Sequence, residues 1–251
     1  MPIMFRLLLV VICSLCAACG KKGLLIPPDR YAPPPVSALQ VVQQGERFRI
    51  SWLAPEQELP LEGSSPPAGF RLYRRELRSP ADECLSCGVE DLLIRTVELE
   101  YLKDVIRIGN LFAVVDGDVQ LGKSYLYQVT VYEKGGVENR DSGRVKRKKV
   151  QPPPPPTVTA GEVPAGIMLE WSTVSVGSGS LTGYNIYRLR PSESFALRPL
   201  TPAPVTENRY EDLRMEPGTV YRYQLRTVAT LEGESVESDP SPQVEGKFIL
   251  P

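Results

Sequence analysis

The chain of 251 residues contains no histidine. Without an imidazole it cannot build a Ser-His-Asp or Cys-His nucleophile site, and it cannot hold a metal ion through histidine. It also lacks the Ser-x-x-Lys and Gly-x-Ser-x-Gly patterns of other nucleophilic serines. Catalysis would therefore have to rely on carboxylates, lysine or cysteine. These absences favour a protein that is not an enzyme and that uses no cofactor and no metal.

An excess of charge of one sign is also missing, as is a helical pattern of apolar residues. The chain has 29 basic and 30 acidic residues, so its net charge gives no general attraction to nucleic acid. No long window repeats apolar residues with the period of an amphipathic helix. The 25 prolines, which occur in clusters, also disfavour long helices. An all-β chain is predicted.

The first residues have the pattern of an export signal. Arg6 precedes an apolar run from Leu7 to Leu15, and two alanines stand directly before Cys19. The run is too short to cross a bilayer core of ~30 Å, which argues against an uncleaved membrane anchor. A signal peptide of residues 1–18, cleaved before the cysteine, accounts for the pattern better.

This segment resembles a bacterial lipoprotein signal, in which diacylglycerol is attached to the cysteine that becomes the first residue. The resemblance implies that Cys19 is lipidated, with acyl chains such as palmitate, and that the chain attaches to a membrane through this lipid. Gly20, and not an aspartate, follows the cysteine. In a Gram-negative cell this implies sorting to the cell outer membrane, facing the periplasm or the cell surface.

Four landmarks occur twice in the same order, which indicates a tandem duplication. The first is a strand that ends in tryptophan, and the second is a segment that begins with glycine and ends in Tyr-Arg. The third is a Gly-x-x-Tyr sequence that continues into a strand, and the fourth is a Val-Glu pair before the last strand. The pairs are Phe48–Trp52 with Ile167–Trp171, Gly69–Arg74 with Gly183–Arg188, Gly122–Val129 with Gly218–Leu225, and Val137–Asn139 with Val236–Ser238.

Apolar and polar residues alternate in these segments. In the third landmark and just beyond it, Tyr127, Val129 and Val131 are separated by Gln128 and Thr130. A period of two places one face of a strand on a core and the other in water, as in an antiparallel sheet. Two modules with about seven such strands each predict tandem immunoglobulin-like β-sandwiches.

The same landmarks resemble fibronectin type III domains. The shared features are a tryptophan on the second strand, Trp52 or Trp171, and the Gly-x-x-Tyr sequence before the sixth strand. The resemblance implies that Tyr125 and Tyr221 are core residues that make a corner hydrogen bond. A lipidated cysteine, a proline-rich tether and two such modules together resemble fibronectin type III lipoproteins of Gram-negative bacteria.

Proline clusters divide the chain into its parts. Residues 151–156 contain five consecutive prolines, which adopt a stiff polyproline II helix, so we expect this linker to hold the modules apart. The stretch before the first module is also rich in proline. The predicted parts are the signal peptide 1–18, the tether 19–35, a first module 36–150, the linker 151–156 and a second module 157–247.

The first module is longer than its repeat between the second and third landmarks. This insertion contains Cys84 and Cys87, followed by an aliphatic run, Leu92 to Leu99, that favours an additional strand. In an oxidising compartment we expect the two thiols to form a disulfide. A thiol-redox site, free thiols and a metal site are the alternatives. A metal would need further ligands from Asp82, Glu83, Glu90 or Asp91.

The densest run of charge is basic, Arg144 to Lys149. One interpretation is contact with anionic lipid headgroups or acidic glycans, since each charge near such a surface contributes ~1 kcal/mol. The other is a solvated last strand whose charges discourage edge pairing.

We therefore expect a lipid-anchored envelope protein that displays its two modules to bind or scaffold an envelope protein or a polysaccharide. Nucleic acid and small-molecule substrates are not expected partners. The alternatives are a passive structural spacer and a thiol-redox enzyme that uses Cys84 and Cys87. Exposed aromatic side chains would favour binding over a spacer, and the candidates are Tyr31, Tyr101, Phe112 and Phe195.

Overall fold

The computed structural model describes residues 32–56, 66–83, 90–193 and 196–249. The predictions for Cys19, Cys84 and Cys87 concern residues outside these ranges. From Pro33 onward the chain forms one compact unit.

Within the described ranges the regular structure is β, apart from a 3₁₀ helix, η2 (Pro80–Glu83). None of this part of the chain forms a helix that is long and apolar enough to cross a membrane.

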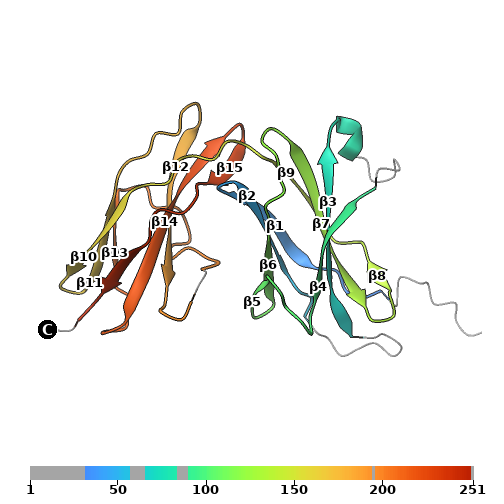
Figure 1. Ribbon diagram of the computed structural model, residues 1–251, viewed down its shortest axis with the longest axis horizontal. Helices are drawn as coiled ribbons and strands as arrows, with labels where there is room; N and C mark the ends of the chain where they lie inside the picture. Colours follow the sequence, from blue (N-terminus) through green and yellow to red (C-terminus); the bar gives the residue numbers. More distant parts are fainter. Residues whose placement is uncertain (1–31, 57–65, 84–89, 194–195, 250–251) are drawn as a thin grey trace, which may run out of the picture. The chain divides into compact units, whose positions relative to one another are not determined.

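The first sandwich consists of two facing antiparallel sheets (Figure 1). One sheet contains, in spatial order, β1 (Ser37–Gln44), β2 (Arg47–Leu53), β6 (Leu111–Asp116) and β5 (Ile106–Ile108). The other contains β4 (Leu92–Glu98), β3 (Pro67–Leu77) and β7 (Ser124–Glu133), with β8 (Glu138–Asn139) and β9 (Arg144–Lys148) both paired with β7. Strand β4 confirms the additional strand predicted in the insertion.

The second sandwich repeats this plan (Figure 1). One sheet contains β10 (Val158–Val163), β11 (Gly166–Trp171) and β13 (Arg209–Asp212). The other contains β12 (Ser180–Leu189) and β14 (Val220–Leu231), with β15 (Glu234–Glu237) and β16 (Val244–Lys247) both paired with β14. In both modules the chain crosses between sheets in the order of an immunoglobulin-like sandwich, the architecture that fibronectin type III domains share. The predicted fold class is confirmed.

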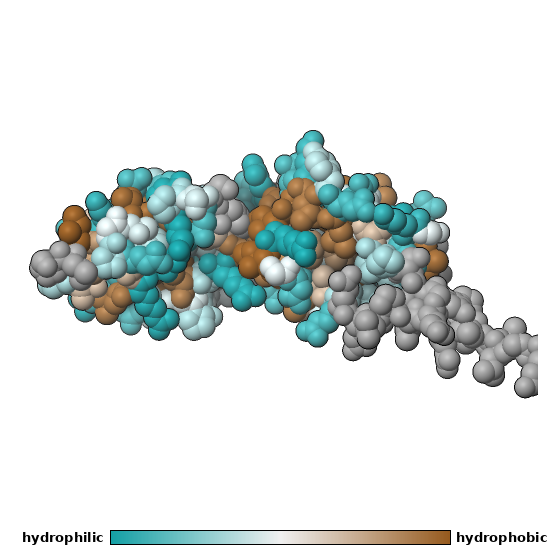
Figure 2. Space-filling view, turned by 90° about the horizontal axis from the view of Figure 1, so that it is seen from below, coloured by the Kyte–Doolittle hydropathy of each residue, from teal (hydrophilic) through white to brown (hydrophobic). Residues whose placement is uncertain are grey.

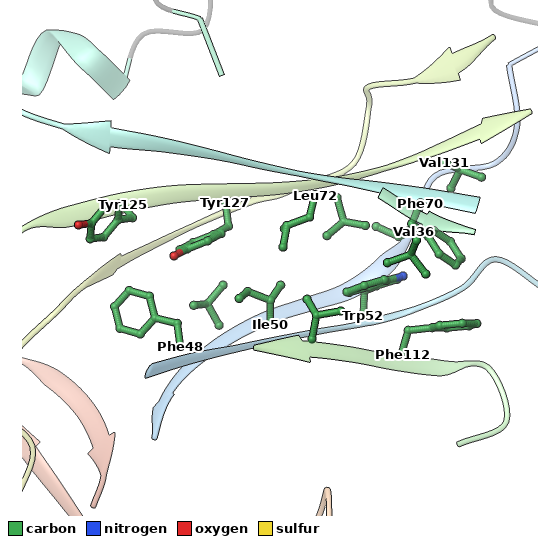
Figure 3. Close-up of a cluster of buried hydrophobic side chains, with 14 residues drawn as sticks. Val36, Phe48, Ile50, Trp52, Phe70, Leu72, Phe112, Tyr125, Tyr127 and Val131 are labelled. Atoms are coloured by element: carbon green, nitrogen blue, oxygen red, sulfur yellow. The ribbon is translucent and has the colours of Figure 1, made fainter. Parts of the chain in front are cut away.

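Alternation along the strands builds the first core. Phe48, Ile50 and Trp52 point from β2 toward Leu72 and Tyr127 on the opposite sheet, as Figure 3 shows. The Trp52 side chain is fully buried, and its ring lies 5.4 Å from that of Phe70 in an edge-to-face arrangement, measured between centroids. Apolar contact and ring geometry both stabilise this arrangement.

The second core is a separate cluster around Trp171, whose ring lies 5.5 Å from that of Tyr184. In each core the hydroxyl of a tyrosine at the start of strand β7 or β14 accepts a hydrogen bond from a backbone N–H at the corner before that strand. Tyr125 accepts the N–H of Gln120 at 2.9 Å, and Tyr221 accepts the N–H of Glu216 at 3.3 Å.

The expectation that the proline linker holds the modules apart is wrong. Pro153 and Pro156 are buried, and the Thr227 hydroxyl donates to the Pro154 carbonyl at 2.7 Å. Proline rings are apolar and proline carbonyls still accept hydrogen bonds, so the segment packs onto the second sandwich.

The two sandwiches contact each other directly. The end of β1 pairs in parallel with β15, where Gln43 aligns with Val236 and Gln44 aligns with Glu237. The Gln43 amide exchanges two hydrogen bonds with the backbone of Val150, at 2.7 and 3.1 Å. Val150 in turn lies in an apolar cluster of the second module. Backbone pairing and apolar contact therefore join the modules in the described residues.

Candidate interaction surfaces

Strand β6 of the first sandwich and strand β13 of the second each end in an aspartate whose carboxylate is buried. Asp212 accepts hydrogen bonds from the Tyr223 hydroxyl at 2.8 Å, from Arg188 at 2.8 Å and from the Arg214 N–H at 3.1 Å. Asp116 receives the same set in the first sandwich, from Tyr127 at 2.8 Å, Arg74 at 2.9 Å and the Asp118 N–H at 3.0 Å.

These carboxylates have a structural role. Burial and then the neighbouring aspartate raise the pKa of Tyr127 and of Tyr223 above the ordinary tyrosine range, so both hydroxyls stay protonated as donors. The carboxylate oxygens are satisfied, and the arrangement is the same in both modules. Sequence reasoning missed it, although Asp116 and Asp212 stand at the same distance before Tyr125 and Tyr221.

A second duplicated feature surrounds Glu138 in the first sandwich. The Glu138 carboxylate accepts from the Tyr73 hydroxyl at 2.8 Å, from the Thr130 hydroxyl at 2.6 Å and from Arg71 at 2.8 Å. Burial alone would raise the pKa of Glu138, but these hydrogen bonds and the charge of Arg140 outweigh it and hold that pKa below its usual range. Glu138 therefore stays ionised at neutral pH. We call Arg71, Tyr73, Thr130, Glu138 and Arg140 the Glu138 face.

The matching face of the second sandwich surrounds Glu237. This carboxylate accepts from the Tyr187 hydroxyl at 2.9 Å and from the Asn185 amide at 2.7 Å, and Arg226 lies 3.7 Å away. The first sandwich covers this face, because Gln44 donates to Glu237 at 2.7 Å. We call Asn185, Tyr187, Arg226 and Glu237 the Glu237 face.

The basic run is neither a free cationic patch nor a merely solvated strand. Each of its cationic side chains pairs with a carboxylate of the same chain, and the Lys149 side chain is only 1% exposed. Arg147 and Lys148 contact Glu234 and Glu232 of the second sandwich at 2.7 and 2.6 Å. The other pairs are Arg144 with Asp91, Lys146 with Glu83, and Lys149 with Glu46. The run therefore helps to join the modules, which its sequence did not indicate.

The acidic residues that flank the insertion are also engaged. The Asp82 carboxylate accepts the backbone N–H groups of Ser79 and Arg78, both at 2.7 Å, and these bonds lower its pKa. Asp91 pairs with Arg75 at 2.8 Å, so its carboxylate lies within a network of arginines. Within the described ranges no group of three or more histidine, cysteine, aspartate or glutamate side chains could hold a metal ion.

Several exposed apolar side chains lie on the strands and the loop at one edge of the first sandwich. We call this the β4–β6 edge, and it consists of Leu92, Leu93, Tyr101, Ile108 and Val115, which are 61, 45, 69, 57 and 38% exposed. Figure 2 views the underside of Figure 1 and shows hydrophobic residues over the part of this sandwich where Figure 1 places β5 and β6. No strand of the described residues pairs with the outer edges of β4 and β5.

The structure describes two of the four aromatic residues that the sequence nominates as exposed side chains. Tyr101 is exposed, but Phe112 is 1% exposed because β6 directs it into the first core against Trp52. Its nomination as an exposed loop residue is wrong. Tyr31 and Phe195 lie outside the described residues.

No protein-family model matches the chain, and no curated protein matches it in sequence. Among solved structures, the chain is similar to the FN1–FN3 domains of chicken CNTN1, at 16% identity and a TM-score of 0.35. That similarity covers 87% of this chain and 69% of the other chain.

Proposed function

We propose that the chain is a binding and scaffolding module that presents the β4–β6 edge of its first sandwich to a protein partner. The observation that carries the proposal is that five of the ten exposed large hydrophobic side chains in the described residues lie on the strands and loop of this edge. Exposed apolar side chains that gather in one place mark interaction sites, whereas scattered ones do not. Leu92 and Leu93 lie in the insertion that the second module lacks, so the fold alone does not require these two exposed side chains.

The chemistry of the edge favours a protein over a polysaccharide. Its side chains are mainly aliphatic, and Tyr101 is the one exposed aromatic residue among the candidates that the structure describes. The open outer edges of β4 and β5 also offer unpaired backbone groups. A partner strand can pair with such an edge while its side chains contact the apolar residues.

The lipid anchor at Cys19 belongs to the same proposal and rests on the signal sequence. Lipidation at this position would hold the sandwiches at a membrane surface, in the outer envelope if the cell is Gram-negative. Mass spectrometry of the mature N-terminus tests it: an N-terminus at another residue, or an unmodified cysteine, would contradict the anchor.

The rivals are a passive spacer and a thiol-redox enzyme. A spacer has no need of an exposed apolar edge. A redox enzyme would work through Cys84 and Cys87, yet the charged groups described beside them, Asp82, Glu83 and Asp91, are engaged in hydrogen bonds and ion pairs. Activated cysteines commonly lie at a helix N-terminus, whereas the one helix in the described ranges, η2, ends at Glu83, directly before Cys84 in the sequence.

Site-specific crosslinking in native membranes tests the partner surface. A photo-reactive residue in place of Ile108 is expected to yield a discrete crosslinked product, because this side chain is exposed on β5, an end strand of its sheet. The matched control is Leu213 on the second sandwich, which is 56% exposed against 57% for Ile108. The same products from both positions, or none from Ile108, would refute the proposed surface.

A further inference from the structure

The duplication sets two related faces at equivalent places in the two modules, and a hairpin occupies one of them. The Glu237 face receives the end of the β1–β2 hairpin: Gln44 donates to the carboxylate, and the Gly45 N–H donates to the Glu237 carbonyl at 2.9 Å. β1 also extends the sheet beyond β15. This contact shows what the face of such a module can bind.

The Glu138 face shares the tyrosine–glutamate pair, but its occupant is the exposed Arg140 side chain of the same module, which lies 5.5 Å from the Tyr73 ring and 3.8 Å from the Glu138 carboxylate. Tyr73 and Glu138 repeat the hydrogen bond of Tyr187 and Glu237, at 2.8 and 2.9 Å. Tyr187 is 5% exposed beneath the hairpin, whereas Tyr73 is only partly buried. No strand in the described part of the chain pairs with the outer side of β8. The outer backbone edge of β8 is therefore unpaired in the described residues.

The Glu138 carboxylate can accept one more donor. An ionised carboxylate has about four acceptor positions. Tyr73 and Thr130 both donate to Oε1, whereas Arg71 donates to Oε2. Arg140 lies 3.8 Å from Oε2, beyond hydrogen-bond distance, so Oε2 has an acceptor position for a donor that displaces this exposed side chain. In Glu237 the Oε2 atom receives Gln44.

We propose that the Glu138 face is a docking site for the end of a β-hairpin from another protein. The hairpin would pair with β8 and would place a carboxamide, such as a glutamine side chain, against Glu138. This site lies on β3, β7 and β8. It borders the β4–β6 edge, because Tyr73 aligns with Leu93 of β4, but it binds through Glu138 and not through apolar side chains, and so goes beyond the proposed function. A chain with both surfaces could hold two partners together.

A second copy of this chain fits the face poorly. Its own β1–β2 hairpin is engaged with β15, which leaves the β10–β11 hairpin of the second sandwich. In that hairpin Val163 takes the place of Gln44 and Glu162 takes the place of Gln43. Val163 has no donor for Glu138, and Glu162 would add a like charge. The occupant is therefore a different protein.

A cyclic peptide that carries residues 40–50 of this chain serves as the probe, because it contains the one hairpin known to bind such a face. We expect saturable binding to the mature chain, with changes in the amide signals of Val137 and Asn139. A peptide with Gln44→Leu should bind about tenfold more weakly, because it lacks the donor to an ionised carboxylate. This comparison needs no change in the protein.

The protein variant Glu138→Gln should weaken binding by a similar factor, whereas Asp118→Asn, at a side chain that is 86% exposed, should not. Absence of saturable binding would overturn the proposal. So would binding that is equal for the two peptides, or signal changes confined to the second sandwich. Because the peptide does not probe Ile108, this result and the crosslinking result can fail separately.

Discussion

Replacing Trp171 by alanine is expected to unfold the second sandwich and to leave the first one folded. Truncating a large aromatic residue in a core costs about 3–5 kcal/mol, against a typical domain stability of about 5–15 kcal/mol. Trp171 lies in its own apolar cluster, which shares no member with the cluster around Trp52. Its indole N–H has no hydrogen-bond partner among the described residues, so packing accounts for its contribution.

The chain contains two tryptophans, so the fluorescence of the remaining tryptophan can follow unfolding in this experiment. In the Trp171→Ala protein, Trp52 alone reports on the first sandwich by fluorescence during denaturant unfolding. Its transition should remain, while circular dichroism shows loss of the second module at lower denaturant. Trp171→Phe should cost less, since it keeps a ring. Simultaneous loss of both modules would show that the contacts between them, and not separate cores, determine stability.

Replacing Asp212 by alanine should be almost as damaging, at about 3 kcal/mol. Asp212 is 2% exposed at its side chain, and its removal would leave the Arg188 charge and the Tyr223 hydroxyl without their main partner. Breaking a buried ion pair from one side typically costs 3–5 kcal/mol. We take the low end because Arg188 keeps 19% exposure and can regain some solvation.

The matched control for Asp212 is Asp118, which also pairs with an arginine but is 86% exposed. Asp118→Ala should change the free energy of unfolding by less than about 1 kcal/mol, as for other surface pairs. Asp116→Ala should reproduce the Asp212 effect in the first sandwich. Equal, small effects at all three positions in chemical denaturation would show that the buried carboxylates do not stabilise the modules.

Local pattern was enough to predict the strands that carry the repeated landmarks. The alternation around Tyr127 and Val129 and the tryptophans at the strand ends gave the sandwich class, because a period of two and a repeated order are local properties. The aliphatic run from Leu92 also gave β4. The repeated landmarks do not predict the burial of Phe112, because none of them lies on its strand, β6.

Contacts between distant parts of the chain could not be predicted. The basic run reads as solvated because its partners, such as Glu234 and Glu46, are far away in sequence. The proline linker is predicted to be a spacer because polyproline II stiffness is a local property. Its hydrogen bond with Thr227 of β14 joins residues that are far apart in sequence. Likewise, the β4–β6 edge becomes a surface only when β4 and β5 lie at the ends of two different sheets.

Protection of Ile108 in the native envelope is the most direct test of the account. Ile108→Cys and Leu213→Cys proteins would be labelled with a polar maleimide, once as purified chains and once in opened native membranes, and the peptide with residue 108 or 213 would be quantified by mass spectrometry. A bound partner predicts that Ile108→Cys labels much more slowly in membranes than in purified form, while Leu213→Cys labels equally in both. Equal labelling of Ile108→Cys in the two states would contradict the claim that this edge binds a protein.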